Sequence, residues 1–233
     1  AAGYPFDVTD PEQVAQSIAR IETEVGPIEV LVNNAGFGQP GAVEDLSRDA
    51  LRAQMETNFF GWVELTNQVI PVMRRQGYGR IIQNSSVLGF VALAYRGAYN
   101  ASKYALEGLS DTLRLELAGT GIHAILIEPG PITSRFRSNA LAAYQRNIDS
   151  ESSVHRETYR ATEARLKRQG AAVPFTLPPE AVLDKVIKAL EIPVPRPRYY
   201  VTFPSYLFGI LKRCLSTRAL DRVLLGVSRR ERK

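Results

Sequence analysis

The sequence predicts an α/β protein, with a three-layer, doubly wound, Rossmann-like parallel sheet in a single domain over residues 1–233. Two observations lead to this fold class. Short apolar runs rich in β-branched residues alternate along the chain with helical patterns of ten or more residues. This order is typical of a parallel sheet that is covered by helices on both faces. The length of 233 residues, 45% of them hydrophobic, suffices for one large domain of this class.

The expected strands and helices follow one another in a regular order. Residues 4–8 are expected to end a strand, and Asp10 and Pro11 then supply a capping residue and a first-turn proline for a helix. The later elements, in chain order, are a strand at residues 28–32, a helix at about 48–75, a strand at 80–85, a helix at about 98–118, a strand at 122–127, a helix near 179–190 and a strand at 198–202.

Two segments fall outside this alternation. Residues 132–178 are polar and irregular or loosely helical, whereas residues 205–233 form a tail in which apolar and basic residues alternate. The tail allows two interpretations. It either packs as helices on the sheet edge or across a dimer interface, or it presents a basic amphipathic surface that touches a membrane weakly.

Composition excludes several classes of function. The net charge is +5, from 29 basic and 24 acidic residues, but no stripe of aromatic and basic residues accompanies it, so nucleic-acid binding is not expected. Cys214 is the only cysteine, and His123 and His155 are the only histidines. We therefore expect no disulfide framework, no metal site and no Ser-His-Asp triad. No apolar run reaches the roughly 18–20 residues that span a bilayer, and no signal peptide is evident, so a cytoplasmic location is expected.

The most informative pair of residues is Tyr99 and Lys103, four positions apart in a helical segment. This spacing places the phenol and the ammonium on the same helix face, one turn apart. A free phenol titrates near pH 10, and a nearby cation lowers its pKa. The pair could therefore act in acid/base chemistry, although an isolated Tyr-x-x-x-Lys is more often an ordinary helix surface.

Four short motifs lie at the carboxyl ends of expected strands, where open α/β sheets bind ligands. They are Asp7-Val8, Asn33-Asn34-Ala35-Gly36, Ser85-Ser86-Val87 and Pro129-Gly130-Pro131-Ile132-Thr133. Ser86 precedes Tyr99 by 13 positions (99 − 86). The common position of these motifs predicts one ligand site along this edge of the sheet.

Together these residues make the chain resemble the short-chain dehydrogenase/reductase family over nearly its whole length. The resemblance implies that Tyr99 is the catalytic acid/base and that Lys103 lowers the pKa of Tyr99 and holds the nicotinamide ribose. It also implies that Ser86 hydrogen-bonds the substrate oxygen, and that Asn58 holds a water that links Lys103 to solvent. Ser86 could alternatively be a turn residue, and Asn58 could simply be exposed.

The resemblance further implies a nicotinamide cofactor, NADP or NAD, with NADP favoured by analogy. Asp7 and Val8 would contact the adenine. The residues expected along the rest of the cofactor cleft are Asn33, Ala35, Gly36, Tyr99 and Lys103, with Pro129, Gly130, Ile132 and Thr133 beside the nicotinamide. Gly36 would act through close backbone approach, and Asn34 would tie neighbouring strands together.

The glycine-rich phosphate loop that the family carries between its first strand and first helix is expected to be missing. We therefore expect the sequence to be an incomplete record of a longer protein, without the first βαβ unit. In that case residues 4–8 have no strand to pair with, and the strand at 28–32 loses one neighbour. The residues that distinguish NAD from NADP would be missing as well.

The substrate is expected to be a small lipophilic aldehyde, ketone or alcohol. The run GAYNASKYALEG at residues 97–108 resembles the branch with 17β-hydroxysteroid and retinol dehydrogenases and similar bacterial aldehyde reductases. By the same resemblance, residues 132–178 form a substrate lid, and the helices at 48–75 and 98–118 build a homodimer or homotetramer. Two alternatives stay open: a non-catalytic nucleotide-binding relative and a nucleotide-sugar epimerase or dehydratase.

Overall fold

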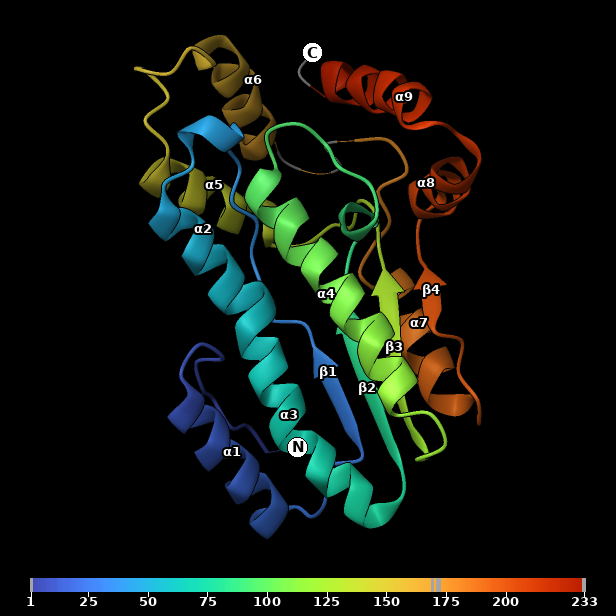
Figure 1. Cartoon of the computed structure of the whole chain (residues 1–233). Coiled ribbons are helices and arrows are strands. Elements are labelled where there is room, and N and C mark those ends of the chain that lie inside the picture. The colour runs from blue at the N-terminus through green and yellow to red at the C-terminus, as the bar shows by residue number, and fades with distance from the viewer. Residues whose placement is uncertain (1, 169, 171–172, 232–233) are drawn as a thin grey trace.

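The computed structural model describes residues 2–168, 170 and 173–231, and its centre is a parallel sheet (Figure 1). Four strands lie in the order β1-β2-β3-β4, and every neighbouring pair is parallel. Their bounds are Val30–Asn33 for β1, Gly79–Asn84 for β2, Ile122–Glu128 for β3 and Arg198–Tyr200 for β4. All four carboxyl ends consequently face the same edge of the sheet.

Helices connect these strands and cover the sheet. In chain order they are α1 (Pro11–Glu24), α2 (Arg48–Met55), a π-helical turn (Glu56–Phe60), α3 (Gly61–Gln76), α4 (Gly97–Glu116), α5 (Phe136–Asn147), α6 (Arg156–Lys167), α7 (Glu180–Glu191), α8 (Phe203–Cys214) and α9 (Thr217–Arg230). Short 3₁₀ turns lie at Val43–Asp45 and Val87–Gly89. The single helix expected at 48–75 thus contains a π-helical turn.

The alternation of side chains along β2 shows how the layers form. Ile81 packs with residues of α1 and α3, whereas its neighbour Ile82 packs with residues of α7 on the opposite face. Both isoleucines are fully buried, as expected for a strand covered on two sides. The structure therefore confirms the predicted α/β fold with helices on both faces of a parallel sheet.

The start of α1 follows from local chemistry. The Asp10 carboxylate accepts hydrogen bonds from the backbone N–H groups of Glu12 and Gln13, which have no partner inside the helix. Pro11 occupies the first turn, where its missing N–H is not needed. The expected helix start is confirmed.

The strand expected at residues 4–8 was wrong. These residues form no strand, although Phe6 packs against the core beneath α1 and α3. A strand needs a neighbour that satisfies its backbone groups, and no described residue pairs with this segment. β1 is an edge strand for the same reason, and Val30 and Val32 are 36% and 43% exposed along it.

The segment at 132–178 is more helical than expected, because it forms α5 and α6. Tyr159 on α6 fixes this segment to the turn after β1: its hydroxyl donates to the Asp45 carboxylate and accepts from the Ala42 N–H. Ser153 also donates to Asp45, at 2.7 Å. A role of this segment as a substrate lid stays a prediction.

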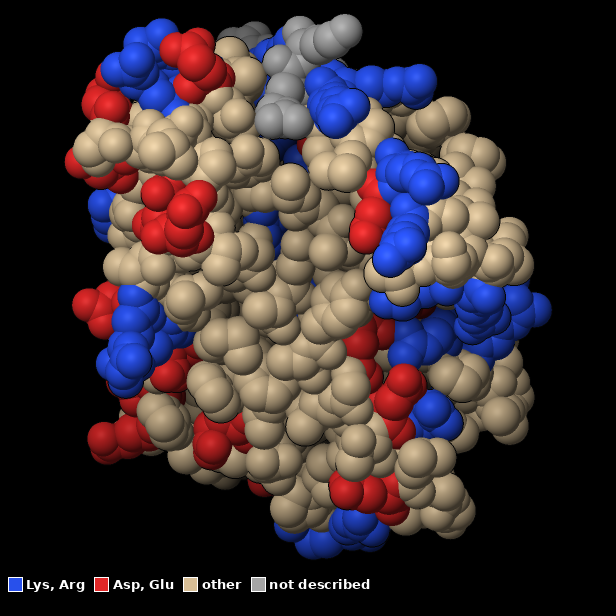
Figure 2. Space-filling view, turned by 45° about the horizontal axis from the view of Figure 1, so that its top comes forward, with Lys and Arg blue, Asp and Glu red and all other residues tan. Residues whose placement is uncertain are grey.

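The tail forms α8 and α9, with residues 232 and 233 lying outside the described residues. Phe208 and Leu224 pack with Val91 in a small core of their own. Figure 2 shows Lys and Arg side chains gathered over the side of the molecule where these two helices lie. In the part of the chain that the structure describes, no helix is long and apolar enough to cross a membrane.

A buried group of charges joins α4 to the last two strands. Arg198 on β4 donates to Glu128 at 2.6 Å and to Asp111 at 2.7 Å, and it contacts Glu107. Glu107 also accepts a hydrogen bond from Ser85, the residue before Ser86. The Arg198 guanidinium therefore contacts three carboxylates, and two of them, Glu107 and Glu128, are almost completely buried.

Burial, together with the neighbouring Glu107, raises the pKa of Glu128 to about 8. The folded protein therefore holds this proton more tightly than the unfolded chain, in which the carboxyl has its ordinary pKa. The free energy of unfolding consequently falls as the pH rises towards about 8, and it changes no further above that pH. Each pH unit inside this window corresponds to about 1.4 kcal/mol for one group.

We expect Glu128→Gln to remove this pH dependence, because the amide does not ionise. Urea unfolding over mildly acidic to mildly basic pH would show the variant losing less stability than the wild type as pH rises. Glu157→Gln, which replaces an exposed carboxylate on α6, is the matched control and should follow the wild type. Parallel pH profiles for Glu128→Gln and the wild type would contradict this account.

Candidate active site

Three of the expected catalytic residues meet where β2 ends and α4 begins. Ser86 follows β2, and its hydroxyl caps the next 3₁₀ turn by accepting from the Leu88 N–H at 3.1 Å. The Ser86 side chain lies near enough to the Tyr99 phenol to lower its pKa. Lys103 lies one turn further along α4, with its Nζ 5.8 Å from the centre of the Tyr99 ring. Tyr99 and Lys103 thus lie one turn apart on the same side of α4, as their spacing predicted.

Lys103 is held by groups that the sequence reasoning did not identify. Its Nζ donates to the backbone oxygen of Asn84 at 2.8 Å and lies 4.1 Å from the centre of the Trp62 ring. Trp62 is itself fixed, because its Nε1 donates to the Ala35 oxygen at 2.8 Å. Trp62 is the only tryptophan in the sequence, and this was the one feature that could have drawn attention to it. Its contact with Lys103 arises only when α3 and α4 come together in the fold.

Burial dominates the pKa values of Tyr99 and Lys103. Burial raises the pKa of Tyr99 to about 12, while Ser86 and the charge of Arg96 lower it only in part. Burial also lowers the pKa of Lys103 to about 7, against a smaller raising effect of Glu107. Desolvation is the largest effect on both groups, and the expectation that Lys103 lowers the pKa of Tyr99 stays a prediction.

Asn58 lies in the π-helical turn and is fully buried. Its Oδ1 accepts from the Phe37 N–H at 3.1 Å, and its Nδ2 donates to the Phe37 oxygen at 2.9 Å. A further contact of 3.4 Å reaches the Ser102 hydroxyl, which donates to the Tyr99 backbone oxygen. Asn58 thus ties the loop after β1 to α4. Its expected role in holding a water stays a prediction.

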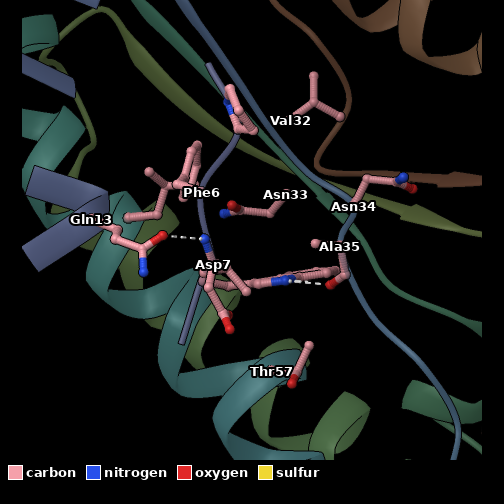
Figure 3. A pocket seen from close by; sticks show the side chains of 12 residues that line it. Phe6, Asp7, Gln13, Val32, Asn33, Asn34, Ala35 and Thr57 are labelled. Atoms are coloured by element: carbon pink, nitrogen blue, oxygen red, sulfur yellow. Dashed lines mark hydrogen bonds between the residues drawn. The ribbon is translucent and has the colours of Figure 1, made fainter. Parts of the chain in front are cut away.

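Some of the expected cofactor residues line a hollow of about 720 Å³ beside β1, whereas Gly36, Tyr99, Lys103 and the segment at 129–133 are not among its lining residues (Figure 3). Asp7, Val8, Asn33 and Ala35 are among its lining residues. Figure 3 shows Asp7 beside Gln13, which accepts a hydrogen bond from the Asp7 N–H, with Ala35 and Thr57 on neighbouring walls. The structure therefore brings together residues from before α1, from the end of β1 and from the π-helical turn.

The two asparagines after β1 have different partners. Asn33 is buried and donates to Thr66 and to Gln83, both at 3.0 Å, so its amide holds β1 to β2 and α3. The Asn34 side chain accepts from Asn84 at 2.6 Å. The prediction that Asn34 ties neighbouring strands is confirmed, and Asn33 has the same function.

The loop after β1 carries Gly36, Gly38 and Gly41 in a G-x-G-x-x-G pattern, the spacing of a glycine-rich phosphate loop, although such a loop was expected to be missing. An added Cβ would lie 2.9 Å from Asn58 at Gly36, 2.6 Å from Phe136 at Gly38 and 2.8 Å from Ile148 at Gly41. These glycines therefore permit close packing, and a 3₁₀ turn rather than an α-helix follows them, so they do not form a phosphate loop.

The segment after β3 crosses the same edge of the sheet. The Pro129 oxygen accepts from the Val87 N–H at 2.8 Å, and an added Cβ on Gly130 would lie 2.2 Å from the Thr202 hydroxyl. Ile132 pairs with Leu177, whose oxygen accepts from the Thr133 N–H at 2.9 Å. The expected nicotinamide-flanking residues thus lie at the strand ends, anchored to residues before α7 and α8.

Phe136 at the start of α5 lies against the catalytic tyrosine candidate. Its ring centre is 5.2 Å from that of Tyr99 in an edge-to-face arrangement. The start of α5 therefore covers one side of the Tyr99 ring.

A dinucleotide fits the residues that the structure describes on this edge. The hollow beside β1 has the size that a nucleoside requires, and the buried Asn33 Oδ1 has no hydrogen-bond partner. Tyr99 and Lys103 would hold the nicotinamide end, and the segment from Pro129 to Thr133 would flank it. The bound group would supply hydride chemistry.

Comparison with known proteins agrees with this geometry. The model of the short chain dehydrogenase family matches residues 1–145, more than half of the chain. The chain therefore belongs to the short-chain dehydrogenase family, whose members are oxidoreductases. The parallel sheet and the gathering of Ser86, Tyr99 and Lys103 at its carboxyl edge are consistent with that membership.

Individual relatives and a solved structure extend the comparison. The oxidoreductase YbbO of Escherichia coli strain K12 is 40% identical over 225 residues, which is 96% of this chain and 77% of that protein. Human 17-beta-hydroxysteroid dehydrogenase type 1 is 36% identical over 200 residues, which is 84% of this chain and 59% of that protein. A short chain dehydrogenase from Burkholderia cenocepacia, solved with NADP, is 25% identical with a TM-score of 0.73 and is matched over 96% of this chain and 80% of its own.

The raised pKa of Tyr99 predicts that this phenol stays protonated through neutral and mildly alkaline pH. Ultraviolet difference spectra of the wild type and Tyr99→Phe, titrated without added ligand, should show no phenolate absorbance assignable to Tyr99 below about pH 10. A midpoint between pH 7 and pH 9 that disappears in Tyr99→Phe would instead support the expectation that Lys103 activates it. Tyr104→Phe on the same helix is the control for loss of one tyrosine.

Proposed function

We propose that this protein reduces a carbonyl group of a lipophilic aldehyde or ketone, with NADP as the cofactor. The observation that carries the proposal is the joint position of Ser86, Tyr99 and Lys103 where β2 ends and α4 begins. A phenol that is protonated at neutral pH can give its proton to a carbonyl oxygen as that oxygen becomes negative. The NADP-bound relative supports the choice of cofactor.

In this mechanism Ser86 and Tyr99 both donate hydrogen bonds to the carbonyl oxygen. Their donation stabilises the negative charge that develops on that oxygen as the carbonyl carbon receives a hydride. Tyr99 then transfers its proton to the oxygen, which leaves an alcohol. Lys103, only 5.8 Å from the Tyr99 ring centre, supplies a positive charge near the phenolate when it is protonated.

Apolar side chains near the strand ends support a lipophilic substrate. Phe136 contacts the Tyr99 ring. The loop after β2 carries Phe90, Val91 and Leu93, which pack with α8 and α9. The named relatives, a hydroxysteroid dehydrogenase among them, agree with an apolar substrate. The gathering of Ser86, Tyr99 and Lys103 favours an enzyme over a non-catalytic nucleotide-binding protein.

Assembly, location and membrane contact stay predictions. A face of α8 exposes Phe203, Tyr206, Leu207 and Ile210 at helical spacing, and the basic pair Lys212 and Arg213 follows in its last turn. This face supports the membrane-surface interpretation of the tail. A homodimer or homotetramer and a cytoplasmic location rest on the sequence alone.

We expect Tyr99→Phe to lower kcat by about 10²–10⁴-fold, because it removes the proton donor. Ser86→Ala should lower kcat by about 10²–10³-fold, because one of two hydrogen bonds to the developing oxyanion is lost. Nicotinamide absorbance, recorded with the full-length protein, NADPH and a panel of aldehydes and ketones, measures both effects. Tyr104→Phe, exposed on the same helix, is the matched control. Wild-type turnover in Tyr99→Phe would overturn the mechanism.

A further inference from the structure

Trp62 on α3 contacts both the hollow beside β1 and the ammonium of Lys103. It is among the residues that line the hollow, and its ring centre is 4.1 Å from the Lys103 Nζ. The residue is 1% exposed, and its Nε1 donates to the Ala35 oxygen at 2.8 Å. Burial and this hydrogen bond together fix the indole, so its face stays turned towards Lys103.

The Lys103 ammonium has few other partners. An ammonium carries three N–H donors, and in the part of the chain that the structure describes only the Asn84 backbone oxygen accepts from this one, at 2.8 Å. No described carboxylate forms an ion pair with it, and Glu107, one turn further along α4, is paired with Arg198. The face of the Trp62 ring is therefore its main remaining partner.

An aromatic ring distinguishes the two protonation states of a lysine. The negative face of the π system attracts the ammonium rather than the neutral amine, most strongly for tryptophan and for a desolvated cation. Burial lowers the pKa of Lys103 to about 7, and the charge of Glu107 opposes this effect. Of the other neighbours, Tyr99 is titratable, with its ring centre 5.8 Å from Nζ, whereas Asn84 and Trp62 do not ionise. The ring contact therefore favours the charged form of an amine that is otherwise close to losing its proton at neutral pH.

We propose that Trp62 is a positioning residue of the site: the face of its ring holds Lys103 at the end of β2 and keeps the amine charged at neutral pH. A charged Lys103 stabilises the phenolate that Tyr99 becomes after it gives its proton to the substrate oxygen. This consequence rests on the proposed carbonyl reduction, whereas the effect of the ring on the amine does not. Without the ring, Lys103 would lose its proton at lower pH.

Two variants of similar side-chain volume isolate the aromatic face. Trp62→Phe and Trp62→Leu both lose the hydrogen bond to Ala35 and both leave space in the core, but only phenylalanine keeps a π face. NMR titration of the Lys103 ¹³Cε resonance in the full-length protein should give a midpoint about one pH unit lower for Trp62→Leu than for the wild type, a tenfold weaker hold on the proton. Trp62→Phe should lie closer to the wild type. Phe60→Leu, which removes an exposed aromatic ring nearby in the chain, is the control and should follow the wild type.

A measurement on the wild type keeps the test independent of how well these variants fold. Tryptophan emission of the full-length protein should change with the same midpoint as the Lys103 resonance, because the charge beside the Trp62 ring is lost there. Lys103→Met should abolish this change. The proposal would be overturned by equal midpoints for Trp62→Phe and Trp62→Leu, by a higher midpoint in Trp62→Leu, or by emission that stays constant while Lys103 titrates.

Turnover tests the catalytic consequence separately. With NADPH and an aldehyde that the wild type reduces, kcat should fall with rising pH about one pH unit earlier in Trp62→Leu than in the wild type, with Trp62→Phe between them. Identical pH profiles for Trp62→Leu and the wild type would overturn the catalytic role of the ring. If no aldehyde or ketone is reduced, the proposed function fails, while the two measurements without ligand still decide on the contact of Trp62 with Lys103.

Discussion

The arrangement of the site depends on the contacts of the buried Lys103 ammonium. It joins α4 to the end of β2 through the Asn84 oxygen and to α3 through the face of Trp62. Trp62 in turn holds the loop after β1 through the Ala35 oxygen. Three segments far apart in the sequence therefore meet around one side chain. The same burial that allows these contacts lowers the pKa of Lys103 to about 7 and places its proton within reach of neutral pH.

A second set of polar contacts keeps Ser86 and Tyr99 in register. Glu107 lies one turn after Lys103 on α4, accepts from Ser85 and is held by Arg198. Because Ser85 directly precedes Ser86, this group connects the start of β4 to the residue that would hold the substrate oxygen. Arg198 is the shared counter-ion of Glu107, Glu128 and Asp111, so its loss would leave two almost completely buried carboxylates without a positive partner. Two sets of contacts thus support the site: the ion pair of Arg198 with Glu107, and the packing of Phe136 on α5 against Tyr99.

The sequence predicted the parts of this protein that depend on local periodicity. The strands β1 to β4, the cap at Asp10 and the pairing of Tyr99 with Lys103 all follow from spacings of a few residues. The contacts of Trp62 and Phe136 were missed because they arise only when separate helices pack together. The strand at residues 4–8 was wrong because a strand depends on its neighbour. Burial raises the pKa of Tyr99, an effect that the spacing of residues could not indicate.

The protonation of Lys103 is the most direct test of the claim that burial sets the proton chemistry of this site. The measurement is an NMR titration of the Lys103 ¹³Cε resonance, assigned by its loss in Lys103→Met. The account predicts a midpoint near pH 7 for the protein without added ligand. A midpoint near the ordinary lysine value of about 10.4 would contradict it, because the ammonium would then be as well solvated as on an open helix surface.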